Sequence, residues 1–132
     1  MRGMWKAWGV LVCALSLSVG AHSEDVPKIP WKSPVRGYLV DLLCSRQRAG
    51  EGVKLGEAHT KMCLQMPPCE SSGYAVMTLD NQIYKFDDKG NEKARKLLDR
   101  TNQPSNFFVL VSGKVEGDEI EVRKIELVKS PN

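Results

Sequence analysis

Four side chains in the middle of the chain are of the types that bind metals or form crosslinks. They are Cys44, His59, Cys63 and Cys69, separated by 14, 3 and 5 residues. Three thiolates and one imidazole can bind zinc tetrahedrally, and soft thiolates also suit copper(I). On a helix, His59 and Cys63 would project from the same face. The spacing matches no standard zinc finger, so a zinc or copper site is only one of two hypotheses.

The other hypothesis is a disulfide. A small exported domain gains stability from a crosslink, and its thiols meet an oxidising environment. A Cys63–Cys69 disulfide would close a short loop, although Cys44 could pair with either partner instead. Of the four cysteines, Cys13 lies within residues 1–23, which are expected to be removed. The other three leave one thiol over, which is uncommon in an exported protein. We favour the disulfide, and the absence of a Cys-x-x-Cys motif disfavours thiol redox chemistry.

The expectation of export comes from residues 1–23. Arg2 and Lys6 precede an apolar run over residues 10–19, and small residues then lead into Glu24. This order is typical of a signal peptide, and the run is too short to span a bilayer, which takes ~20 residues. We therefore expect a periplasmic or secreted protein with a tether over residues 24–34 and one domain over residues 35–132.

Composition limits the partners of that domain. The chain is 42% hydrophobic and 27% charged, as in soluble globular proteins. Loss of Arg2 and Lys6 with the leader would lower the net charge from +3 to +1. A nearly neutral domain has no general attraction for nucleic acid. No later segment is long and apolar enough to predict a membrane span.

Hydrophobic patterning predicts a mostly β domain with two helices. Strands are expected over residues 35–43, 74–79, 82–86, 107–115 and 119–128, and helices over 57–66 and 90–100. Asp80-Asn81 suits a tight hairpin turn. In the last strand the apolar parity changes, so a β-bulge is expected at Arg123-Lys124. Residues 45–56 are expected to form a loop, and Pro67-Pro68 to end the first helix.

The order strand, strand, strand, helix, strand, strand predicts a five-stranded OB-like barrel, with a short helix between the first two strands. The alternative is an open α+β sheet packed by the two helices. Several segments of the chain resemble a group of small exported bacterial proteins of uncharacterised function. These segments are residues 37–44, 59–63, 73–76, 84–87 and 111–115. The resemblance implies export and an OB-like fold, and it brings no activity.

No paired-carboxylate site, phosphate-binding loop or serine-triad signature is visible, so we expect a protein that is not an enzyme. The favoured expectation is an exported OB-like binding module stabilised by a disulfide, with a protein, peptide or saccharide ligand. The alternative is a zinc- or copper-binding module that uses the four Cys and His side chains.

Overall fold

The computed structural model describes residues 34–132. The predicted signal peptide and almost all of the predicted tether lie outside these described residues. Within them, the strands are β1 (Val35–Asp41), β2 (Tyr74–Met77), β3 (Ile83–Phe86), β4 (Phe108–Glu116) and β5 (Glu119–Leu127). The helices are α1 (Leu42–Gln47), α2 (Val53–Ala58), α3 (Lys61–Leu64), α4 (Pro67–Ser72) and α5 (Asp88–Arg100), with a 3-10 turn η1 (Ala49–Glu51).

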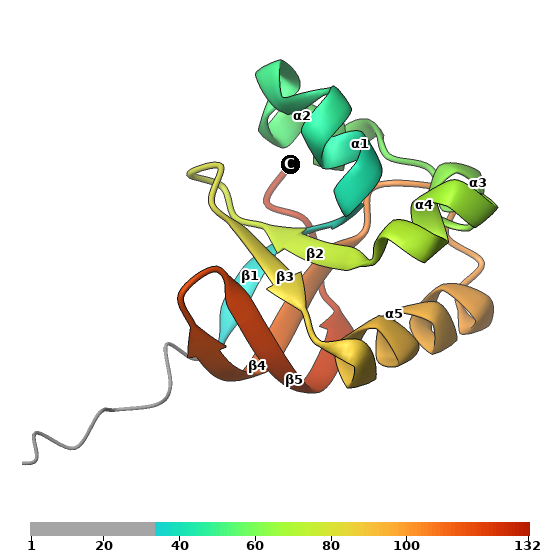
Figure 1. Ribbon diagram of the computed structural model, residues 1–132. Coiled ribbons are helices and arrows are strands. Elements are labelled where there is room, and N and C mark those ends of the chain that lie inside the picture. The colour runs from blue at the N-terminus through green and yellow to red at the C-terminus, as the bar shows by residue number, and fades with distance from the viewer. Residues whose placement is uncertain (1–33) are drawn as a thin grey trace, which may run out of the picture.

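The five strands close into a ring in the order β1-β2-β3-β5-β4 (Figure 1). Strand β1 makes the closure possible because its first half pairs with β4 and its second half with β2. All pairs are antiparallel except β3 with β5. Gly37 permits the close approach of β1 and β2, since a Cβ there would overlap the backbone of Met77.

Two apolar clusters lie on opposite faces of β1 and β2. The larger cluster includes Leu39 and Val76 and extends to Leu98 of α5. The smaller one joins Val40 and Ala75 to Leu55 of α2. Alternate residues of a strand point to opposite faces, so burial on both sides explains the nearly continuous apolar sequence of β1.

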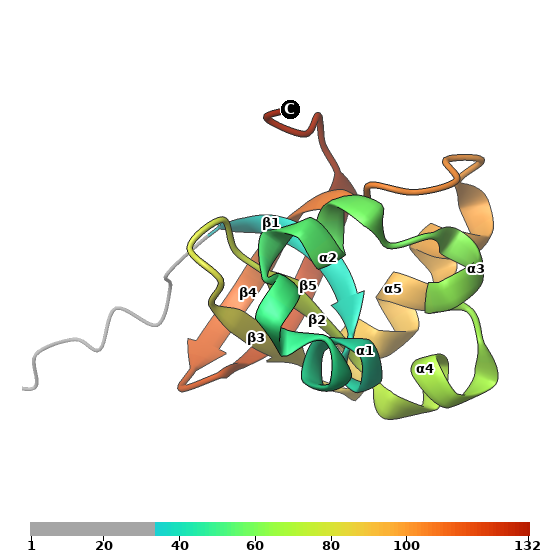
Figure 2. The ribbon, with the colours of Figure 1, turned by 90° about the horizontal axis from the view of Figure 1, so that it is seen from above.

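The helices cover the ring from two directions. Figure 1 shows α1 and α2 on one side of the ring and α5 on the other, with α3 and α4 between them. Seen from above in Figure 2, α1 and α2 lie across the strands. Helix α5 begins one residue after its N-cap Asp87, earlier than expected, and Asp87 accepts a hydrogen bond from the Gly90 N–H (3.0 Å). No helix within residues 34–132 is long and apolar enough to cross a membrane.

The segment between β1 and β2 differs most from expectation. The predicted loop over residues 45–56 is largely helical, and the predicted helix over 57–66 is broken at His59-Thr60. Thr60 caps α3 through its side chain, and the Lys61 N–H donates to the Pro104 carbonyl (2.8 Å). These contacts hold Thr60 in an extended conformation, so the predicted helix over residues 57–66 cannot continue through it. Pro67-Pro68 starts α4 instead of only ending a helix, because proline fits the first turn.

Other local predictions are confirmed. Asn81 has a φ of 64° in the turn between β2 and β3, which confirms the place of the turn, although the connection covers residues 78–82 and is longer than expected. The register of β4 and β5 shifts so that Ser112 pairs with Lys124 and Gly113 with Val122, which places the bulge at Arg123 as predicted. The five strands and the helix between β3 and β4 are also confirmed, and the sheet is closed, not open. The expected mostly β class is not confirmed: the described residues hold about as much helix as strand, because the segment between β1 and β2 is largely helical, so the domain is mixed.

Candidate metal centre

The candidate metal centre includes Asp41, the last residue of β1, which is followed directly by α1. A charged residue here interrupts an apolar run, and its side chain caps the helix. Its Oδ1 accepts a hydrogen bond from the Cys44 N–H (2.8 Å). The Asp41 side chain is completely buried. Because N-cap Asp and Cys44 are three residues apart, the helix itself places the carboxylate beside the thiol.

Helix α4 brings in the second thiol. The start of α1 is joined to the end of α4 by two hydrogen bonds, from the Leu42 N–H to the Gly73 carbonyl (2.9 Å) and from the Leu43 N–H to Ser72 Oγ (3.1 Å). With the helices held in this way, Cys69 lies opposite Cys44. One ligand atom each from Asp41, Cys44 and Cys69 lies within 4.8 Å of the other two.

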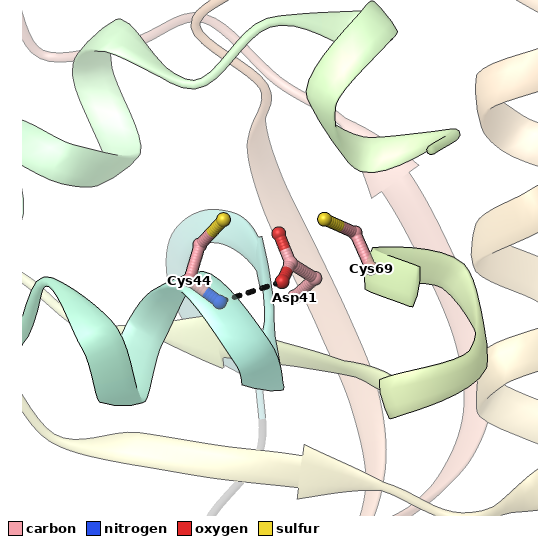
Figure 3. A group of neighbouring side chains, drawn as sticks. All are labelled: Asp41, Cys44 and Cys69. Carbon is pink, nitrogen blue, oxygen red and sulfur yellow. Dashed lines mark hydrogen bonds between the residues drawn. The ribbon is translucent and has the colours of Figure 1, made fainter. Parts of the chain in front are cut away.

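Figure 3 shows the Asp41 carboxylate between the two sulfur atoms. One carboxylate oxygen, Oδ1, is turned towards the Cys44 backbone, as the hydrogen bond requires. The other, Oδ2, faces the side on which the two thiols lie. Two sulfur ligands and one oxygen ligand therefore converge on one small volume.

His59 contacts the carboxylate from the far end of α2, where it is the C-cap residue. Its Nε2 lies 2.8 Å from Asp41 Oδ2, and the side chains are 1% and 0% exposed. The distance is that of an ion pair, but the oxygen does not lie along the direction of a well-formed N–H hydrogen bond. His59 Nδ1 also has no hydrogen-bond partner among the described residues.

Buried polar atoms without directed partners are rare, and an ion or water at the site is a common reason. Here three such atoms are close together, namely Asp41 Oδ2 and both ring nitrogens of His59. Oδ2 already lies 2.8 Å from His59 Nε2. A cation beside Oδ2 would add a directed partner to that contact. The two thiols and the undirected contact at Oδ2 therefore indicate one candidate cation site, beside Oδ2 of Asp41.

Burial and charge act on the pKa values of the centre. Burial alone would raise the pKa of Asp41, but the contact with His59 and the Cys44 N–H together hold it below its ordinary value. Burial first, and then the negative charge of Asp41, raise the pKa of Cys44 to about 12. The same two causes raise the pKa of Cys69. Without a cation, both thiols are therefore protonated at neutral pH.

The structure brings together two of the four predicted ligands, Cys44 and Cys69. His59 reaches them through Asp41, and neither His59 nor Cys63 belongs to the group of mutually close ligand atoms. Cys63 is the third residue of α3, as Cys44 is of α1 and Cys69 of α4. Within residues 34–132 the cysteines are Cys44, Cys63 and Cys69, and each is a free thiol in this structure, with no pair at disulfide distance. The break in the predicted helix separates His59 from Cys63, and the packing of α4 on α1 places Cys69 beside Cys44.

Asp41 is the candidate ligand that the sequence analysis missed. Its signal was a single acidic residue among Leu39, Val40, Leu42 and Leu43, three positions before a cysteine. A carboxylate is seldom placed in such a run unless it has a partner. That pattern would have predicted a helix cap and a buried charge, but not the approach of Cys69.

Comparison with protein-family models, with curated proteins and with solved structures finds no match. The resemblance to small exported bacterial proteins therefore rests on the sequence segments alone. The function has to be argued from the geometry of the centre.

Proposed function

We propose that this protein is an exported metal-binding module of OB-like fold that holds a zinc ion between Asp41, Cys44 and Cys69. The observation that carries the proposal is the convergence of two thiols on a completely buried carboxylate. Support for the OB-like fold comes from the strand order, the parallel pairing of β3 with β5, and the helix between β3 and β4.

The donor set favours zinc over copper(I). Zinc accepts thiolate, imidazole and carboxylate ligands, whereas copper(I) prefers soft sulfur ligands alone. A hard carboxylate at the middle of the set therefore fits zinc better. Binding replaces the two thiol protons by the metal, and a water molecule or a fourth side chain would complete a tetrahedral site.

His59 is proposed as a positioning residue. His59 Nε2 lies 2.8 Å from Oδ2 of Asp41, and the Cys44 N–H donates to Oδ1, so each carboxylate oxygen has one neighbour that orients it. Such outer contacts orient a ligand before the metal arrives, and their removal typically weakens metal affinity roughly 10–100-fold. The proposal is one of binding, and no catalytic step is attributed to the centre.

Metal analysis of the reduced mature protein tests the proposal. We expect one zinc per chain, and a cobalt(II)-loaded sample should show thiolate-to-metal charge-transfer absorption. Cys44→Ser and Cys69→Ser should each weaken zinc binding by more than about 100-fold, the upper end of the effect of an outer contact. Cys63→Ser is the matched control and should retain zinc affinity.

Three results would change the proposed centre. Equal loss of zinc in all three Cys→Ser variants would move the site towards the predicted set that includes Cys63. Substoichiometric zinc in the reduced wild-type protein would remove the zinc proposal. Tight binding of copper(I), measured by competition with a copper-specific chelator, together with weak binding of zinc would show that the same residues bind copper(I) and not zinc.

A further inference from the structure

A second site is suggested by a groove between α5 and β5, far from the thiols in sequence. Its volume is about 390 Å³. Lys93, Lys96 and Arg100 of α5 form one wall, and residues 123–127 of β5 form the other. We call it the α5–β5 groove.

The α5–β5 groove runs along the edge of β5. Successive residues of a strand point to opposite faces, so five consecutive residues can line one groove only along the strand edge. Strand β3 pairs with β5 only at Glu119 and Ile120. From Glu121 to Leu127, β4 is the only strand partner of β5 among the described residues. At the start of this stretch the Val122 N–H donates to Asp87 Oδ1 (3.0 Å), so the edge is occupied there. Along residues 124–127, no strand of the described residues other than β4 pairs with β5, and this part of the edge can accept another strand.

The charge of the groove is strongly one-sided. Five of its nine lining residues are Lys or Arg, and Glu126 is its single acid. Residues 34–132 carry 15 Lys and Arg against 14 Asp and Glu, so the rest of the domain is net negative. Lys93 and Arg100 make no ion pair with any described residue, whereas Lys96 pairs with Glu92 (2.9 Å). Such a concentration of positive charge attracts an acidic partner.

The floor of the groove is apolar. Leu97, Ile125 and Leu127 are half-buried and lie among the basic side chains. An extended chain presents alternate side chains to opposite sides, so it can place apolar groups on this floor and acidic groups against the lysines. The lining contains no aromatic residue, although stacking on aromatic side chains is a principal means of binding single-stranded nucleic acid.

We propose that the α5–β5 groove binds an extended acidic polypeptide segment, which adds as a strand to the free edge of β5. Its main chain pairs with residues 124–127, and its carboxylates face Lys93, Lys96 and Arg100. The site is separate from the zinc centre and does not depend on it.

A labelled heptapeptide of alternating Glu and Val is the probe, with fluorescence anisotropy at low salt as the measurement. The mature protein should bind it, and Lys93→Glu together with Arg100→Glu should weaken binding by more than about 10-fold, because like charges then face the peptide. Lys93→Gln with Arg100→Gln should give a smaller loss in the same direction. Lys54→Glu, an exposed lysine of α2 outside the groove, is the matched control and should bind as the wild type does.

Two further measurements separate strand addition from simple charge attraction. The same peptide with alternate amides N-methylated should lose binding, since it keeps its charge but cannot pair as a strand. Backbone amide shifts in NMR spectra should change most at residues 123–127. Equal binding of the methylated peptide, shifts located elsewhere, or tighter binding of a ten-nucleotide oligothymidylate would each overturn the proposal.

Discussion

Nε2 of His59 lies 2.8 Å from Oδ2 of Asp41, and this contact joins the end of β1 to the end of α2 inside the protein. The two residues are 18 positions apart in the sequence and almost wholly buried. His59 is itself held by the Asn106 N–H, which donates to its carbonyl oxygen (3.4 Å). The carboxylate that faces the thiols is therefore positioned by two separate parts of the chain.

Replacing Asp41 by Asn removes the charge but keeps a side chain able to cap α1. We expect the metal-free protein to lose about 1–3 kcal/mol, the cost of leaving a buried polar partner unsatisfied. Urea unfolding measures this free energy. The exposed Asp118 pairs with Lys85 at the surface (3.2 Å), so Asp118→Asn is the matched control and should change stability by less than about 0.5 kcal/mol.

The contact between Asp41 and His59 also predicts how the free energy of unfolding depends on pH. The pKa of Asp41 is lower in the folded protein than its ordinary value. Its contribution to stability is therefore fully present above about pH 4, where the unfolded chain is ionised, and is lost as the pH falls through the folded pKa. The stability difference between wild type and Asp41→Asn should shrink below about pH 4. A difference that stays constant down to pH 2 would show that the charge of Asp41 is not involved.

The raised pKa of Cys44 predicts slow alkylation. Only the thiolate reacts, and burial beside Asp41 raises the pKa of Cys44 to about 12. At pH 8 the metal-free native protein should react with iodoacetamide at Cys44 at least about 10-fold more slowly than the urea-unfolded protein, because each pKa unit changes the thiolate fraction about tenfold. Peptide mass spectrometry gives the rate at each cysteine. Asp41→Asn should speed the native reaction, since it removes one of the two causes.

Oxidation should join Cys44 to Cys69, because their ligand atoms lie within 4.8 Å of each other. With glutathione disulfide as oxidant, the two thiols give up two protons and two electrons, and one protein disulfide and two glutathione molecules result. Peptide mapping without reductant identifies the pair, and zinc bound at both sulfurs should protect them. A Cys63–Cys69 disulfide as the main product would instead support the original sequence prediction.

Gly37 tests the closure of the ring. A Cβ at this position would overlap the Met77 carbonyl on the paired strand, so Gly37→Ala should cost at least about 1–3 kcal/mol, as overpacking does. Gly50 has open space around its Cα and no positive φ, which makes Gly50→Ala the control. It should change stability by less than about 0.5 kcal/mol. Equal effects in urea unfolding would mean that β1 and β2 do not approach as closely as described.

Sequence alone determined the features that depend on neighbouring residues. Alternation located the strands, Asn81 marked the hairpin turn, and the parity change in β5 located the bulge at Arg123. The prediction failed between β1 and β2, where short helices are stabilised by distant contacts. There Thr60 forms an isolated β-bridge with Ser105. Helix α1 is held to α4 in part by the hydrogen bond from the Leu43 N–H to Ser72 Oγ.

Tertiary structure decided the composition of the candidate centre. The sequence identified Cys44 and Cys69 as candidates, but 24 residues separate them and no spacing rule connects them. It also grouped them with Cys63 and overlooked Asp41. Periodicity reports which face of its own element a side chain occupies, whereas a metal centre depends on where separate elements meet. The packing of α4 on α1 sets that meeting point, and it places two thiols beside one buried carboxylate.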